Sequence, residues 1–180
     1  MQPGLVGQDD RYYRWPGMQT TNSEHPRIAI REAKPEDVPA IYQLILELAE
    51  FEQALEKVEN TETRLLEDGF GENPLYKCFV ADDHGAIVGI ALVYFRYSTW
   101  KGRTLYLEDL IVTRQRRGEG LGKALLVRCA DYARQTGSRL MIWQVLDWNT
   151  GAIDFYKSLG AELQPEWINC VLPSEAFPVS

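Results

Sequence analysis

Glycines and arginines gather between residues 112 and 122 in a pattern that suits the binding of phosphate groups. Gly118, Gly120 and Gly122 follow the arginine-rich stretch 114–117 and directly precede a run of apolar residues at helical spacing. Glycine lets the backbone come close to a ligand, and the unpaired N–H groups at the start of a helix attract anions. This segment therefore predicts a pyrophosphate cradle between a strand and a helix.

Three kinds of nucleotide-binding loop contain such glycines. A Walker A loop requires Gly-Lys-Ser/Thr after four intervening residues, which this sequence lacks. A dinucleotide fingerprint needs its third glycine at position 123, where this chain has Lys123. The acetyl-CoA loop, Gln/Arg-x-x-Gly-x-Gly/Ala, fits Gln115, Gly118 and Gly120. An ordinary glycine-rich turn would share this local pattern, so the loop alone leaves that alternative open.

A second pattern follows at residues 147–161. Asn149, Ala152, Tyr156 and Gly160 have the spacing Asn-x-x-Ala-x-x-x-Tyr-x-x-x-Gly. The two patterns, in this order and separation, resemble the GNAT superfamily of N-acetyltransferases. The resemblance implies a single α/β domain with the GNAT (acyl-CoA N-acyltransferase) fold, a mixed, mostly antiparallel central sheet flanked by helices. It also implies acetyl-CoA as the acetyl donor and no metal.

The resemblance narrows to the diamine acetyltransferases, the spermidine/spermine N1-acetyltransferase group, and is closest to the thialysine N-epsilon-acetyltransferases. It extends over about residues 27–172. The stretches that carry it are 47–52, 68–71, 97–103, 106–109 and 145–149. It implies transfer of the acetyl group to the primary amine of a small cationic substrate (thialysine, a diamine or a polyamine), by direct attack in a ternary complex, and a homodimer.

Three side chains are the candidates for the chemistry. An alkylamine has a pKa of about 10.4, so a base must help to free it of its proton. Glu108 is the candidate base, directly or through water, and by resemblance also contacts the amine. Strand alternation would turn Asp109 to the opposite face unless a bulge intervenes, so we expect it to be a weaker substrate carboxylate. Tyr156 matches the general acid that protonates the CoA sulfur, although a tyrosine packed on the sheet would look the same.

The resemblance assigns the remaining site residues. An amide near Leu110 is the expected donor to the acetyl oxygen. The residues implied in donor binding are Leu110, Ile111, Val112, Gly118, Glu119, Gly120, Leu121, Gly122, Lys123, Asn149, Thr150, Gly151, Ala152 and Tyr156. Those implied in amine binding are Phe51, Glu52, Trp100, Glu108, Asp109, Trp143, Gln144 and Glu166. A solvated helix face is the plainer interpretation of the acidic run 47–56.

The composition and charge of the chain argue against several other classes of protein. With 45% hydrophobic and 25% charged residues, the 180-residue chain is ordinary for one globular domain. The net charge of −7 argues against nucleic acid as a partner and suits a cationic substrate. No apolar run is long enough to predict a membrane span. The three cysteines are widely spaced within apolar stretches, so we expect packed, reduced thiols in the cytoplasm rather than disulfides or a metal site.

The elements that must position these residues alternate between strand and helix patterns. We expect residues 1–25 to be an extension outside the domain, which then covers residues 26–180. The predicted strands are 27–31, 76–81, 86–97, 104–112, 140–146 and 168–172. The predicted helices begin at 34–38, run over 61–67, follow the glycine loop as far as Gly137, and run over 150–159.

Two alternatives remain to the small-amine enzyme. A peptide or protein N-terminal acetyltransferase would share the fold but would need an open groove. A non-catalytic acyl-CoA-binding module would keep the glycine loop without needing Glu108 or Tyr156, and the presence of both favours an enzyme. Within the diamine group, a thioether near the amine lowers its pKa. An enzyme with one modest base should therefore favour thialysine or a short diamine over spermine.

Overall fold

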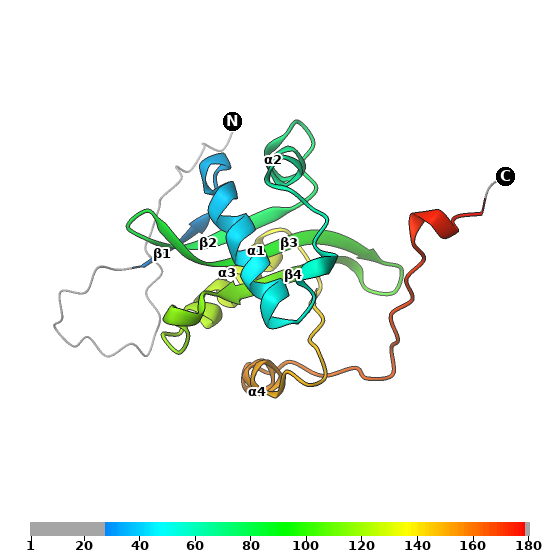
Figure 1. Ribbon diagram of the computed structural model, residues 1–180. Coiled ribbons are helices and arrows are strands. Elements are labelled where there is room, and N and C mark those ends of the chain that lie inside the picture. Colours follow the sequence, from blue (N-terminus) through cyan, green and yellow to red (C-terminus); the bar gives the residue numbers. More distant parts are fainter. Residues whose placement is uncertain (1–27, 179–180) are drawn as a thin grey trace, which may run out of the picture. The chain divides into compact units, whose positions relative to one another are not determined.

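A computed structural model of the chain describes residues 28–178 (Figure 1). The predicted extension, 1–25, lies outside the described residues. The chain divides into two compact units, Met1–Trp143 and Gln144–Ser180. The first unit carries the sheet, the glycine loop and both candidate carboxylates. The second carries the Asn149 and Tyr156 pattern.

Within residues 28–178, five strands form one sheet in the order β1-β2-β3-β4-β5. Figure 1 labels the first four of them. The strands are β1 (Ala29–Glu32), β2 (Lys77–Asp83), β3 (Ala86–Ser98), β4 (Gly102–Val112) and β5 (Met141–Ile142). All neighbours are antiparallel except β4 and β5, which run parallel. The prediction of a mixed, mostly antiparallel sheet is therefore confirmed.

Four α-helices accompany the sheet in the described part of the chain. They are α1 (Val38–Phe51), α2 (Glu62–Phe70), α3 (Leu121–Gln135) and α4 (Thr150–Ser158). Short 3-10 turns lie at η1 (Pro35–Asp37), η2 (Leu55–Lys57), η3 (Arg114–Arg116) and η4 (Ser174–Ala176). Pro35 opens η1, where its missing N–H costs nothing.

Helices α1 and α3 cover opposite faces of the sheet. Ile41 and Leu44 of α1 pack against a buried cluster that includes Cys78 and Val80 of β2. The residue between them, Phe79, contacts the Tyr132 ring of α3 at a centroid distance of 5.5 Å. Since successive strand residues point to opposite faces, this alternation separates an α1 face from an α3 face.

A bulge interrupts β4 beside the candidate base. Leu92 of β3 pairs with Asp109, whereas the next residue, Val93, pairs with Leu107. Glu108 is thus the extra residue, and a bulge of this kind redirects the side chains around it. Cys78, Leu92 and Asp109 are cross-strand partners, so Asp109 lies on the α1 face. Strand alternation alone would place Asp109 on the opposite face from Glu108 unless a bulge intervened, and the structure contains this bulge.

Several predicted boundaries are wrong. The strand 140–146 shrinks to β5, because only Met141 and Ile142 pair with β4. Residues 168–172 form no strand in the part of the chain that the structure describes, because strand-forming side chains do not suffice without a paired neighbour. Helix α2 passes through Gly69 and is closed instead by the Gly71 N–H, which donates to the Glu67 carbonyl. Cys170 is exposed, unlike the buried Cys78 and Cys129.

Candidate functional site

The glycine loop leads from β4 through η3 directly into α3. Gly118 and Gly120 adopt φ angles of +83° and +82°, in the left-handed region that favours glycine. A Cβ at either position would meet no atom within 4 Å, so open space lies in front of both. Gly120 is the N-cap of α3 and, as a glycine, offers no side chain to cap the first N–H groups of that helix. The loop can therefore accept an anion against its backbone.

Charged side chains fix this loop to the sheet. Arg116 contacts Asp83 of the β2–β3 hairpin at 2.5 Å and Glu119 at 2.8 Å. The Arg117 Nε donates to the Val112 carbonyl at 3.1 Å. The hydrogen bond from Arg116 lowers the pKa of Glu119. Because the Glu119 carboxylate is committed to Arg116, its backbone is the part of the residue that can serve a ligand.

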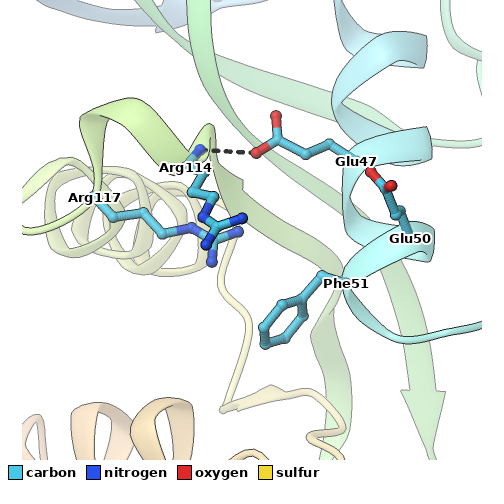
Figure 2. Close-up of a pocket in the computed structure, with 5 residues that line it drawn as sticks. All are labelled: Glu47, Glu50, Phe51, Arg114 and Arg117. Atoms are coloured by element: carbon cyan, nitrogen blue, oxygen red, sulfur yellow. Dashed lines mark hydrogen bonds between the residues drawn. The ribbon is translucent and has the colours of Figure 1, made fainter.

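A pocket of about 420 Å³ lies between α1 and the start of the loop. Figure 2 shows its lining residues, which are Glu47, Glu50, Phe51, Arg114 and Arg117. The guanidinium groups of Arg114 and Arg117 lie together and point towards the side of Phe51 (Figure 2), with the Arg117 guanidinium carbon 5.2 Å from the ring centroid. Phe51, predicted for amine binding, thus shares a pocket with two cations.

Three carboxylates gather on the α1 face of the sheet. Burial, together with the negative charges of Glu108 and Glu52, raises the pKa of Asp109 to about 6. Partial desolvation also raises the pKa of Glu52, at the end of α1. A carboxylate with a pKa near 6 is well matched to accept a proton near neutral pH. The bulge thus brings two predicted substrate carboxylates and the predicted base into one acidic cluster.

Two tyrosines that sequence reasoning missed flank this cluster. Tyr94 of β3 pairs with Tyr106 of β4, and their ring centroids lie 5.1 Å apart. Burial raises the pKa of Tyr94 to about 12, together with the charge of Glu108 and a hydrogen bond to it. Burial and the Glu108 charge also raise the pKa of Tyr106. Strand alternation from Glu108 could have found Tyr106, but Tyr94 requires the register between the strands.

The other predicted residues of this unit lie along β4 and its ends. Leu110, Ile111 and Val112 form the end of the strand that runs into the glycine loop. Trp100 lies at the other end, exposed in the β3–β4 turn. Trp143 follows β5 and is half-buried. The first half of β4 therefore separates Trp100 from the acidic cluster.

The second unit carries the Asn149 and Tyr156 pattern. The Asn149 side chain caps α4 by accepting a hydrogen bond from the Ala152 N–H at 3.2 Å. Tyr156 is the buried residue of this helix, next to the Phe155 ring, and burial raises its pKa to about 12. A phenol with this pKa keeps its proton at neutral pH. Gln144 donates to the Asn169 side chain, and Glu166 is exposed.

Other kinds of site find little support. Within residues 28–178, no group of three or more His, Cys, Asp or Glu side chains could hold a metal ion. None of the helices in this range combines the length and apolar character needed to cross a membrane. Burial raises the pKa of the Cys78 thiol, and that of the Cys129 thiol to about 12, so both are protonated packing residues rather than nucleophiles.

The chain is similar to known proteins in its sequence and in its fold. The model of the acetyltransferase (GNAT) family matches residues 38–161. A thialysine N-epsilon-acetyltransferase from Bos taurus is 45% identical over 143 residues, 75% of this chain and 84% of the relative. Spermidine/spermine N(1)-acetyltransferase-like protein 1 from Homo sapiens is 40% identical over 152 residues, 81% of this chain and 22% of that longer relative.

Solved structures extend the likeness of fold. An aminoglycoside acetyltransferase from an uncultured soil metagenomic sample, in complex with trehalose, has a TM-score of 0.68 to this chain. It is 22% identical, and the match covers 81% of this chain and 97% of that one. A likeness at this identity establishes the fold alone.

Proposed function

Since this chain belongs to the acetyltransferase (GNAT) family and is an N-acetyltransferase, we propose that it acetylates the primary amine of a small cationic substrate, using acetyl-CoA as the donor. The observation that carries the proposal is the acidic cluster of Glu52, Glu108 and Asp109 on the sheet face under α1. Three carboxylates attract an ammonium group, and one of them can take its proton.

The glycine loop suits the phosphate groups of the donor. The left-handed Gly118 and Gly120 leave open space where a side chain would stand, at the N-terminus of α3. Backbone N–H groups there would hold the pyrophosphate, while Arg114 and Arg117 supply positive charge beside it. The resemblance adds Leu121 to Lys123 on this side, and Asn149 to Ala152 from the second unit.

The acceptor amine would bind at the acidic cluster and lose its proton there. Glu108 and Glu52 would hold the ammonium form, and Asp109, whose pKa is about 6, has the affinity for protons that a base needs near neutral pH. The free amine then attacks the thioester carbonyl. We assign the base role to the pair Glu108 and Asp109 rather than to Glu108 alone.

The remaining two tasks belong to a backbone amide and a phenol. The amide near Leu110, just beyond the bulge, would stabilise the negative charge that develops on the acetyl oxygen. Tyr156 would give its proton to the leaving thiolate of CoA. Burial raises the pKa of Tyr156 to about 12, so the phenol is protonated at neutral pH. It can donate to a thiolate, whose conjugate acid has a pKa of about 8.5, only when the two groups are hydrogen-bonded and well placed.

Within small amines, we assign thialysine or a short diamine as the preferred acceptor. The sulfur of thialysine withdraws electrons and lowers the pKa of the amine, so less help from a base is needed. The 45% identity to a thialysine N-epsilon-acetyltransferase supports this choice. Assembly as a homodimer and a cytoplasmic location are further parts of the proposal, drawn from the resemblance and the composition.

A thiol-release assay with acetyl-CoA and a panel of amines tests this function. We expect kcat/KM to be highest for thialysine or a short diamine, lower for spermine, and lowest for a peptide with a free N-terminus. A tenfold preference for spermine or the peptide, about 1.4 kcal/mol in transition-state binding, would overturn the substrate assignment. Acetyl-CoA binding without release of thiol for any amine would instead indicate a binding module.

A further inference from the structure

A single carboxylate of α1 holds the start of the glycine loop. The Glu47 Oε1 accepts a hydrogen bond from the Arg114 backbone N–H at 2.7 Å (Figure 2). Its Oε2 accepts a second from the Thr113 hydroxyl at 2.9 Å. Both donors lie at the junction of β4 and η3, immediately before the loop. Hydrogen bonds to a carboxylate are shorter and stronger than those between neutral groups.

Through Thr113, this contact also reaches Gln115. The Thr113 hydroxyl lies 2.7 Å from the Gln115 side-chain amide. A hydroxyl has one proton to donate, and the Glu47 carboxylate is the stronger acceptor. The Gln115 side chain must therefore donate an N–H to the Thr113 hydroxyl oxygen. This requires the oxygen and nitrogen of the Gln115 amide to be exchanged, so that its nitrogen faces Thr113. Gln115 is the first residue of the loop pattern, and its side chain contacts Thr113 and extends this hydrogen-bond network into the loop.

The contact joins elements that carry the two halves of the proposed site. Glu47 is one helical turn before Phe51 and Glu52, while Thr113 and Arg114 precede the phosphate cradle. The half-buried Glu47 differs here from Glu56, an exposed carboxylate of the same acidic run. A loop held in its binding conformation before the ligand arrives loses less entropy on binding.

We propose that Glu47 is a positioning residue that pre-forms the acetyl-CoA loop by fixing Thr113 and Arg114 to α1. This inference rests on the proposed function, since it presumes that the loop binds the donor. Glu47 itself faces the backbone and hydroxyl donors, so it acts through the loop. Its loss should weaken donor binding more than it slows the chemical step.

Calorimetric titration with CoA tests the proposal, with wild type, Glu47→Ala, Glu47→Gln and the control Glu56→Ala compared well below their melting temperatures. Glu47→Ala should raise the Kd about tenfold and the KM for acetyl-CoA likewise, with kcat within twofold of wild type. Glu47→Gln should recover most of the affinity, because its oxygen still accepts from Arg114 and its N–H can donate to Thr113. Glu56→Ala should bind CoA as wild type does.

The outcomes separate this inference from the function beneath it. If wild type binds CoA and the well-folded Glu47→Ala binds it equally, with only a lower Tm, Glu47 is a stability anchor and the proposal is wrong. If wild type binds no CoA, the proposed function fails as well. Should Glu47→Ala not fold, Thr113→Val and Thr113→Ser take its place. Valine should weaken CoA binding about threefold and serine should not, and equal affinities would contradict the proposal.

Discussion

Asp109 should trade stability for function, which makes its neutral analogue informative. The pKa of Asp109 rises from 3.8 to about 6 in the folded protein, chiefly through burial. Each pKa unit corresponds to about 1.4 kcal/mol, so the ionised carboxylate costs the folded state about 3 kcal/mol at pH 8. Asp109→Asn keeps the shape and removes the charge. We therefore expect this variant to be more stable than wild type at pH 8 and to turn over more slowly.

The pH dependence of the stability gain in Asp109→Asn tests whether the gain comes from removing the buried charge. Because the folded-state pKa is raised, the folded protein holds the proton more tightly, and the cost shrinks as the pH falls from 6 towards 3.8. By the same linkage, the advantage of Asp109→Asn should fall to about half at pH 5. Urea unfolding at both pH values measures it, with the exposed Glu36→Gln as a control that should change stability by no more than about 0.5 kcal/mol. A variant that is less stable than wild type at pH 8, or whose gain does not depend on pH, would refute the reasoning.

Three further predictions concern the chemistry and the loop. Tyr156→Phe removes only the phenolic proton, so kcat should fall by roughly 10²–10⁴ with little change in the KM for the amine, and near-normal turnover with chemistry rate-limiting would end the acid assignment. Gly120→Glu places bulk and negative charge in the cradle and should abolish CoA binding by calorimetry. Gly137→Glu, at another left-handed glycine with φ +71°, controls for backbone strain and should leave CoA affinity unchanged. Glu108→Gln should lower kcat/KM more at pH 6.5 than at pH 9, since the amine is harder to deprotonate at low pH, and a uniform loss would point to binding alone.

The local features of this chain were predictable from the sequence. Helix α1 buries Val38, Ile41 and Leu44 on one face, because helical spacing alone determines which side chains share a face. The conformations of Gly118 and Gly120 likewise follow from a turn that other residues adopt only with strain. Asn149, the first residue of the second sequence pattern, caps α4, and such a cap depends only on the neighbouring N–H groups.

Features that depend on pairing between distant segments were not predictable. The side of the sheet on which Asp109 lies depends on the bulge opposite Leu92 and Val93, which no local pattern announces. Glu47 looks like any other carboxylate of an acidic helix end until the fold brings it to Thr113, 66 residues away. The short β5 also depends on a distant segment. Its sequence predicts a longer strand, but a strand extends only as far as its partner pairs with it.

The product of the reaction tests the central claim most directly. Thialysine incubated with the protein and acetyl-CoA can be followed by mass spectrometry, with fragmentation to locate the acetyl group. We expect one acetyl group, on the side-chain amine, formed in proportion to the CoA thiol released. Release of thiol without an acetylated amine, or an unchanged amine after many equivalents of acetyl-CoA, would contradict the conclusion that this protein transfers acetyl groups to small amines.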